Sequence, residues 1–503
     1  MESESSKQIK RGALLSYVVV IFNMATGLIY TPWMISQIGQ ENYGLYTLAT
    51  SLITMFTMDF GMSMAASRFL SKYIAEGNQE AANNLMGLVY KLYTVIDGII
   101  FVALIVVYFF IDSIYSNLRA EEIVVFKNLY LIVGLYTVVT FPFVTLNGVL
   151  TSYEKYVPLK LCDLFYKIFV VGTVIVALSI GGNIYTLVSI NAIGGLFSVV
   201  VKLIVIYRKT PIRPNFKFFN KETLREIFGF SVWTTITALA QRLIINITPT
   251  IIAAVSITGS IGVAIFGLGS AIEGYVFVFA SALNGLFMPK VSRMVYQEHN
   301  KEGIMNLAIR VGRIQCMLTG LLVVGFIAVG KSFIVDIWNK PDFEASYICA
   351  VLLILPSYFH LPMEIMHTAL VVENKVRLQS AIYTIMGLMN ALISLVLSRT
   401  YGAVGASVSI FLAYTVRSTM MAYIYQSKLH FDMVRFFKET YLKISPALIC
   451  VLGLGVFAER YNPISNHWLR FFVNGVIIVL AAVVLLYKFV MHEDEKNMIR
   501  NLI

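Results

Sequence analysis

Charged residues are scarce in this chain of 503 residues. Only 13% are Asp, Glu, Lys or Arg, about half the usual share for a soluble domain, whereas 58% are hydrophobic. That composition leaves too few polar side chains to cover a water-soluble core of this size. We therefore expect the chain to lie in a lipid bilayer.

Cysteine is also rare, which bears on disulfides and metal clusters. Cys162, Cys316, Cys349 and Cys450 all fall in apolar segments, and no two have the short spacing of a metal-binding pair. The sequence therefore predicts neither a disulfide nor a zinc cluster, and the four thiols are expected to pack as small apolar groups.

Acidic residues are fewer than basic ones, and the net charge is +11. The basic residues form no continuous patch with interleaved aromatics, so nucleic acid is not an expected partner. They fall in short loops between apolar runs, as expected for a protein that crosses a membrane.

Long apolar runs are abundant, and about fourteen of them approach the length needed to cross a bilayer, about twenty residues. The chain is thus expected to be an all-α integral membrane protein. The expected spans are 12–35, 43–65, 87–111, 123–146, 158–180, 184–207, 227–255, 262–285, 307–330, 346–370, 378–398, 402–425, 441–458 and 468–490.

Lysine and arginine gather in the tails and in every second loop. The richest loop holds Arg208, Lys209, Arg213, Lys217, Lys221 and Arg225. Basic loops favour the cytoplasmic side, so both termini are predicted to be cytoplasmic.

Positions about 220 residues apart repeat each other. Gly39 and Leu48 match Gly259 and Leu268, and segments 150–155 and 182–190 match 370–375 and 402–410. A duplicated bundle of helices is a common transporter architecture. The pattern predicts a pseudo-twofold pair of six-helix lobes, 1–207 and 227–425, joined by a cytoplasmic linker at 208–226. Residues 426–503 would add a C-terminal helix pair and a cytoplasmic tail.

Three short motifs carry a family resemblance. They are Ile38 to Tyr46 (IGQENYGLY), Asp59 to Met62 (DFGM) followed by Arg68-Phe69, and Met288 to Ser292 (MPKVS). They resemble the bacterial polysaccharide flippases, of O-antigen or capsule type, in the multidrug/oligosaccharidyl-lipid/polysaccharide exporter superfamily. The resemblance implies alternating access, a bacterial cell-membrane location and a cargo of oligosaccharide on an isoprenoid pyrophosphate. It also implies polysaccharide-assembly proteins as partners.

The charge most relevant to that cargo is Arg242, in the middle of the seventh expected span. Asn246 lies one turn further on and Gln241 is adjacent, so polar groups gather there. A guanidinium in a cavity can hold phosphate oxygens bidentately. The alternatives are an ion pair with Glu273 in the eighth span and extension of the side chain to the interface.

Hydroxyl and amide groups line the first two expected spans, with Asn23 and Thr54 among them. Such groups both donate and accept hydrogen bonds, which suits sugar recognition. They also serve as ordinary contacts between membrane helices.

Carboxylates and lysines in the first lobe are candidates for ion coupling. Asp163 and Lys167 are four residues apart and are expected to pair. Asp97 has no local partner. It could couple transport to a proton or sodium gradient, or reach Lys167 or Lys91 from another helix.

His360, Glu364 and His367 share helical spacing next to Pro362. The cluster could line a polar cavity or relay protons, or it could be purely structural. Metal binding is the weakest interpretation, because a single, proline-interrupted segment supplies all the ligands.

Three classes of function remain. The leading prediction is a flippase for lipid-linked oligosaccharide, without a cofactor and without enzymatic activity. The first alternative is a cation-coupled exporter of drugs or other small molecules. The second is a membrane polysaccharide polymerase or glycosyltransferase, which the short external loops disfavour because loops usually carry such sites.

Overall fold

The computed structural model describes residues 4–57, 62–280, 287–296, 298–338, 340–373 and 375–500, and these form helices joined by short connections, with no strand among them. Eleven helical segments within them are long and apolar enough to cross a membrane. Many large apolar side chains on these helices face outward, Phe109 with 73% and Val176 with 62% of its surface exposed. Because water would disfavour such a surface, the expected all-α membrane fold is confirmed.

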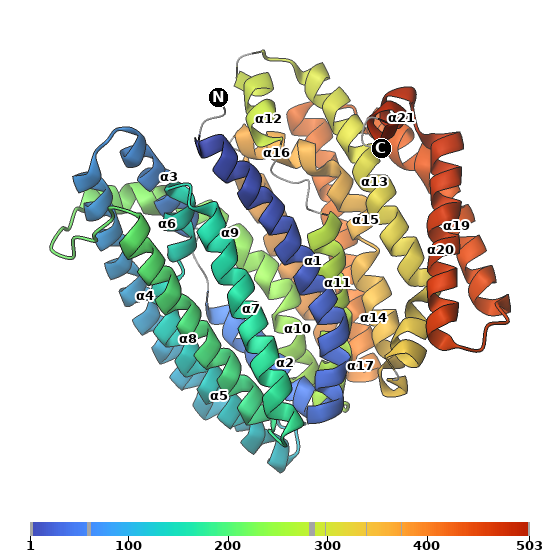
Figure 1. Cartoon of the computed structure of the whole chain (residues 1–503), viewed down its shortest axis with the longest axis horizontal. Coiled ribbons are helices and arrows are strands. Elements are labelled where there is room, and N and C mark those ends of the chain that lie inside the picture. Colours follow the sequence, from blue (N-terminus) through green and yellow to red (C-terminus); the bar gives the residue numbers. More distant parts are fainter. Residues whose placement is uncertain are drawn as a thin grey trace. The chain divides into compact units, whose positions relative to one another are not determined.

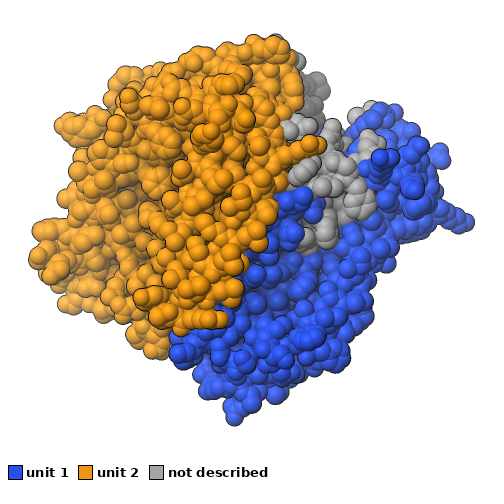
Figure 2. Space-filling view, turned by 180° about the vertical axis from the view of Figure 1, so that it is seen from behind, with its two compact units in different colours: residues 1–264 blue, residues 265–503 orange. Residues whose placement is uncertain are grey.

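Two compact units divide the chain between Ala264 and Ile265, and Figure 2 colours them separately. The first unit contains the helices that are listed here with their bounds: α1 (Glu4–Ile38), α2 (Gln40–Phe56), α3 (Met62–Ala75), α4 (Gln79–Ile114), α5 (Ala120–Thr140), η1 (Phe141–Phe143), α6 (Leu146–Ser152), α7 (Tyr156–Ser179), α8 (Ile184–Lys209), α9 (Lys221–Ile245), α10 (Ile247–Val255) and the start of α11 (Gly259–Ala280). Among them, α7 packs between α1 and α8 (Figure 1).

The second unit holds the rest of α11 and the C-terminal helices. Their bounds are α12 (Met288–Tyr296), α13 (Lys301–Ser332), η3 (Phe333–Ile337), η4 (Pro341–Phe343), α14 (Glu344–Ile354), α15 (Ser357–His360), η5 (Leu361–Met363), α16 (Glu364–Val372), α17 (Val376–Leu429), α18 (Met433–Phe437), η6 (Lys438–Leu442), α19 (Lys443–Tyr461), α20 (His467–Leu485), η7 (Leu486–Val490) and α21 (Glu493–Arg500). The central α13 packs against both α19 and α20 (Figure 1).

The long helix α17 is two spans joined by a sharp reversal. Gly402 has non-helical angles, φ 55° and ψ −132°. The Ser409 hydroxyl donates to Asn390 Oδ1 at 2.7 Å, although 19 residues of straight helix would separate them by about 28 Å. Both expected spans, 378–398 and 402–425, are therefore present. The total of fourteen spans stays a prediction, because α1 and the short α2 are not among the eleven segments.

The boundary between the two compact units falls later in the chain than the predicted boundary between the two repeats. The seventh expected span, formed by α9 and α10, belongs to the first compact unit together with α2 and α3. The expected linker at 208–226 is helical at both ends, and its irregular part covers residues 210–220. The repeat-based lobe boundaries stay a prediction, because they describe a duplication rather than a set of contacts.

Matching positions of the proposed repeat adopt matching backbone geometry. In segment 150–155 the last amide donates to the first carbonyl at 2.8 Å, and in segment 370–375 the same bond measures 3.0 Å. Gly39 and Gly259, 220 residues apart, both have positive φ at the start of a helix. These local agreements support the duplication.

A buried ion pair attaches the C-terminal helix to the second unit. The Arg313 side chain in α13 is 2% exposed, and its Nε and Nη2 atoms donate to the Glu495 carboxylate at 2.7 and 3.0 Å. Further donations reach the carbonyls of Glu439 and Val490. Desolvation works against the charge of Glu495, but the bonds from Arg313 and the His492 amide outweigh it and lower the pKa of Glu495.

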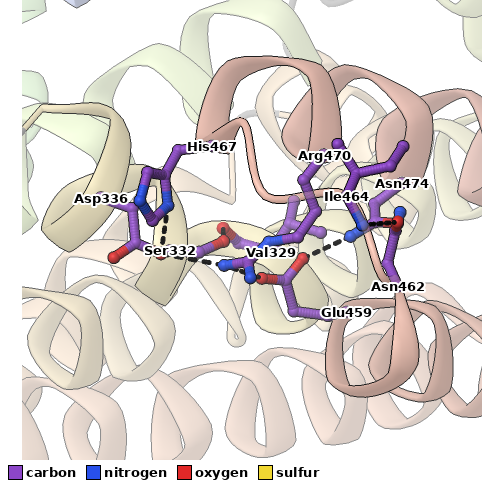
Figure 3. A network of polar contacts seen from close by, with 9 residues as sticks. All are labelled: Val329, Ser332, Asp336, Glu459, Asn462, Ile464, His467, Arg470 and Asn474. Carbon is purple, nitrogen blue, oxygen red and sulfur yellow. Dashed lines mark hydrogen bonds and ion pairs between the residues drawn. The ribbon is translucent and has the colours of Figure 1, made fainter.

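A second polar network joins the C-terminal helix pair to η3, which directly follows α13 (Figure 3). Arg470 lies between two carboxylates, 3.1 Å from Asp336 and 3.4 Å from Glu459. Asn474 donates to Glu459 at 2.6 Å, and Asn462 donates to Asn474 at 2.8 Å. The C-terminal helix pair thus contacts the rest of the second unit through this network at one end and is followed by the Arg313–Glu495 ion pair at the other.

Candidate functional site

The second unit brings together an arginine, a carboxylate and several aromatic rings in its membrane-spanning helices. Glu273 follows Gly259 by 14 residues in α11, and Arg417 follows Gly402 by 15 in α17. At about 1.5 Å per residue, the two charges reach similar depths along their helices. They lie within electrostatic range of each other. We name Glu273, His360, Tyr383, Tyr414 and Arg417 the unit 2 cluster.

Arg417 is positioned by aromatic rings rather than by hydrogen bonds. Its guanidinium carbon is 5.1 Å from the Tyr383 ring centre and 5.4 Å from that of Tyr414. Within the described part of the chain its guanidinium donates no hydrogen bond, and no carboxylate oxygen lies within ion-pair distance of it. These cation–π contacts hold the group beside the two rings and leave its N–H donors for an anionic ligand or water.

His360 lies at the edge of this cluster. Its ring is parallel to that of Tyr414, with centres 6.1 Å apart, and it also stacks on Phe277 of α11. Its Nδ1 is 3.1 Å from the carbonyl oxygen of Pro356. His360 is therefore part of an aromatic wall beside the Arg417 charge.

Glu364 and His367 follow His360 across the expected break in the helix. The interruption at Pro362 is confirmed, since α15 ends at His360 and α16 begins at Glu364. His367 Nδ1 and Glu364 Oε1 are 3.6 Å apart. Within the residues that the structure describes, no group of three potential ligands is arranged for a metal ion. Roles for these residues in proton relay stay predictions.

Arg242 contacts the C-terminal end of a helix in the first unit. Its Nη1 donates to the carbonyl oxygens of Thr54 and Thr57, at 2.5 and 2.7 Å, where α2 ends. Cationic groups are favoured at that end because the last carbonyls of a helix lack partners within it. Part of the donor capacity of Arg242 is thus used in capping α2. Anion binding and pairing with Glu273 both stay predictions.

Gln241, Asn246, Asn23 and Thr54 also lie in the first unit, where the Thr54 carbonyl contacts Arg242. Gln241 is exposed, Asn246 ends α9 one turn after Arg242, and Asn23 is half-buried in α1. The Thr54 hydroxyl donates to the carbonyl of Thr50 at 2.6 Å. That bond occupies its donor with its own helix, as is usual for hydroxyls in membrane helices.

The expected pair of Asp163 with Lys167 is wrong. Asp163 accepts from Lys202 of the neighbouring helix α8 at 2.8 Å, and Lys202 also donates to Asn147. The cause is packing, since α7 and α8 lie side by side and bring Lys202 next to Asp163 (Figure 1). A role for Asp163 or Lys167 in ion coupling stays a prediction.

Asp97 has an unsatisfied oxygen in α4. Its Oδ1 is buried and accepts no hydrogen bond from any residue that the structure describes. Lys91, one of its expected partners, donates instead to the carbonyl of Phe218 at 3.2 Å. A buried carboxylate oxygen without a donor disfavours the charged form, which suits a group that takes up a proton or a cation.

The isosteric change Asp97→Asn tests this role. If Asp97 couples transport to an ion gradient, the variant should transport at a rate that no longer depends on the imposed proton or sodium gradient. The matched control is Asp112→Asn, which removes an exposed carboxylate from the same helix as Asp97, where it pairs with Lys127 of α5. A variant at Asp97 that keeps the gradient dependence of the wild type would exclude it from coupling.

Sequence analysis did not identify Arg417, Tyr383 or Tyr414 as site residues. Arg417 was detectable as a charge within an apolar span. The two tyrosines carry no such signal, because aromatic residues occur throughout these helices. Of the motif residues, Asp59, Phe60 and Gly61 lie outside the described residues.

Comparison with known proteins identifies the family. A family model described as "Polysaccharide biosynthesis protein" matches residues 9–295, more than half of the chain. The chain belongs to this polysaccharide biosynthesis family. A related sequence is an uncharacterized membrane protein of Methanocaldococcus jannaschii, 23% identical over 410 residues, which cover 78% of this chain and 92% of that protein.

Solved structures share the fold of this family member. The lipid II flippase MurJ in an inward closed conformation matches with a TM-score of 0.72 at 15% identity, covering 94% of this chain and 97% of MurJ. An inward-facing multidrug resistance MATE transporter of the MOP superfamily matches with a TM-score of 0.63 at 14% identity, covering 85% of this chain and 99% of that transporter. The resemblance seen in the sequence motifs is confirmed, and the fold is one used by flippases and transporters.

Proposed function

We propose that this protein is a flippase that moves an isoprenoid-pyrophosphate-linked oligosaccharide from the cytoplasmic to the outer leaflet for surface polysaccharide synthesis. Membership of the polysaccharide biosynthesis family supports the class of cargo. The protein is not an enzyme, and it resides in a bacterial cell membrane with both termini in the cytoplasm. Polysaccharide-assembly proteins receive its product.

The arrangement of Arg417 is the observation that carries the proposal. A pyrophosphate offers several negatively charged oxygens, and a guanidinium held beside the rings of Tyr383 and Tyr414 can bind two of them side by side. The Arg417 charge would not help to bind an apolar cargo. An arginine in lipid also costs free energy unless a ligand or water solvates it. Arg417 therefore binds the pyrophosphate, while the isoprenoid remains in the bilayer.

The neighbouring groups suit the sugars. The rings of Tyr383, Tyr414 and His360 offer flat apolar faces for sugar C–H groups, and the polar edge atoms can hydrogen-bond to hydroxyls. Glu273 adds an acceptor at similar depth. The same unit can thus contact both the charged and the sugar portions of one head group.

The alternative is a cation-coupled exporter of small molecules. Glu273 is the observation in its favour, because a carboxylate in a membrane span can bind a cationic substrate or a coupling ion. The two functions differ in the ligand that the purified protein binds, a lipid-linked pyrophosphate or an organic cation. Transbilayer movement of a lipid-linked oligosaccharide by the purified protein is the decisive test.

A further inference from the structure

The irregular segment 210–220 lies against the end of α4 and is fixed there. The amides of Arg213 and Asn215 donate to the side chain and the carbonyl of Asn83, at 2.7 and 2.9 Å. Asn215 also donates to the side chain of Asn84. The absence of a side chain at Gly87 permits this contact, because a Cβ there would lie 1.9 Å from the Asn215 carbonyl oxygen. Segment 210–220, the green loop at the left edge of Figure 1, is therefore packed against α4 as part of the first unit.

An apolar pocket of about 540 Å³ lies between this segment, α4, α6 and α8. Its floor includes Met86, Val149 and Ile212, all nearly inaccessible to solvent. Ile204 and Tyr207 line it as well, and they are 47% and 67% exposed, so the pocket opens on the outer surface of the helices. A pocket of this size and lining suits an apolar chain.

Two arginines, Arg208 and Arg213, line the same pocket and are exposed to solvent. The Arg213 guanidinium is stacked 4.2 Å from the Tyr207 ring centre and donates to the carbonyls of Tyr207, Thr210 and Ile212 at 2.9, 3.2 and 2.6 Å, so its position is fixed and it contributes chiefly its charge to the pocket. The Arg208 side chain donates no hydrogen bond to another described residue and can turn toward a ligand.

The stretch of chain that supplies α8 and segment 210–220 to the pocket carries charge of one sign. No Asp or Glu lies in the sequence between Asp163 and Glu222, whereas Lys209 and Lys217 accompany the two arginines. Phe216 and Phe219 of the same segment are 59% and 68% exposed, as is common for aromatic rings at a membrane interface. The surface therefore complements a ligand with an apolar chain and an anionic head.

We propose that this pocket binds an anionic phospholipid, with one acyl chain between α4, α6 and α8 and the phosphate between Arg208 and Arg213. The bound lipid would hold segment 210–220 and α8 at the membrane surface. The site lies wholly within the first unit and shares no residue with the unit 2 cluster, so its failure would leave the proposed function untouched.

Native mass spectrometry of the purified full-length protein tests the proposal, with phosphatidylglycerol and phosphatidylcholine titrated separately. We expect the wild type to bind phosphatidylglycerol about tenfold more tightly, because both lipids offer a phosphate but phosphatidylcholine also carries a quaternary ammonium, which the basic residues beside the pocket repel. Arg208→Gln should remove that preference. Leu203→Trp, which fills the pocket, should weaken the binding of both lipids.

The matched control is Arg225→Gln, which removes an exposed arginine from α9 outside the pocket. It should keep the preference for phosphatidylglycerol. Equal binding of the two lipids by the wild type, or an equal loss in both arginine variants, would overturn the proposal.

Two competitors distinguish other sources of phosphate. Glycerol 3-phosphate has the head-group charge without an acyl chain and should not displace phosphatidylglycerol. A short isoprenyl pyrophosphate at equal concentration should not displace it either. Displacement by glycerol 3-phosphate would make this a site for a soluble phosphate. Displacement by the isoprenyl pyrophosphate would make it part of the cargo path. Either result would overturn the proposal.

Discussion

Replacing Arg417 with alanine is expected to lower the apparent affinity for a lipid-linked oligosaccharide about tenfold to 100-fold. The loss corresponds to the charge-assisted hydrogen bonds to the pyrophosphate, about 1.5–3 kcal/mol. Arg417→Lys should retain part of the affinity, because it keeps the charge and loses the planar fork of donors. Binding and transport by the purified variants in liposomes measure both effects.

Arg399→Ala is the matched control for Arg417. It removes an exposed arginine from the same helix, α17, and should bind and transport like the wild type. A purely structural role for Arg417 would instead lower the melting temperature and leave the affinity of the folded protein unchanged. Equal affinity in the wild type and Arg417→Ala would remove Arg417 from the substrate site.

Replacing Glu495 with alanine should destabilise the second unit by about 3–5 kcal/mol, because the buried Arg313 loses its carboxylate partner. The lowered pKa of Glu495 also gives this contribution a pH dependence. The contribution is present above the unfolded pKa of the carboxyl group and is lost as the pH falls through the lower, folded pKa. Thermal unfolding of the purified protein, monitored by thiol labelling of the buried cysteines, measures the loss of stability and its pH dependence.

Glu493→Ala provides the control for this prediction. Glu493 is in the same helix, and its carboxylate is 71% exposed and pairs with Lys496 at the surface, an interaction worth at most about 1 kcal/mol. Replacing Arg313 and Glu495 together by methionine should recover stability relative to Glu495→Ala. Equal melting temperatures for Glu495→Ala and Glu493→Ala would show that the ion pair does not stabilise the unit.

The fold was predictable because the hydrophobic pattern alone determines where a membrane helix can lie. The observed helices Tyr156–Ser179 and Ile184–Lys209 nearly coincide with the expected spans 158–180 and 184–207. The reversal at Gly402 was also visible, as a glycine between two apolar runs and as part of the repeat. Local signals were sufficient for these elements.

The polar contacts were less predictable, because they depend on which helices become neighbours. Asp163 had a lysine four residues away in sequence, yet it pairs with Lys202 from the adjacent helix. Arg242 was identified as a telling charge, but the carbonyls of Thr54 and Thr57 that it contacts carry no sequence signal, since every residue has one. Spacing along one helix predicts which side chains share a face and not what packs against that face.

The same limit applies to the unit 2 cluster. Glu273 and His360 were recognised as candidates, and the structure adds Arg417 with its two tyrosines from another helix. The repeat pointed toward this asymmetry, since Ile53 occupies the position equivalent to Glu273 and Phe197 that equivalent to Arg417. A symmetric scaffold whose two halves carry different charges suits a cargo whose two ends differ.

Transbilayer movement in proteoliposomes tests the central claim most directly. The purified protein is reconstituted with a fluorescent lipid-linked oligosaccharide in both leaflets, and an added membrane-impermeant reductant quenches the label in the outer leaflet alone. We predict nearly complete quenching with the wild type, and quenching of only about half the label in protein-free vesicles or with Arg417→Ala. Half quenching with the correctly folded wild type, under an imposed proton or sodium gradient as well, would contradict the assignment as a flippase for this cargo.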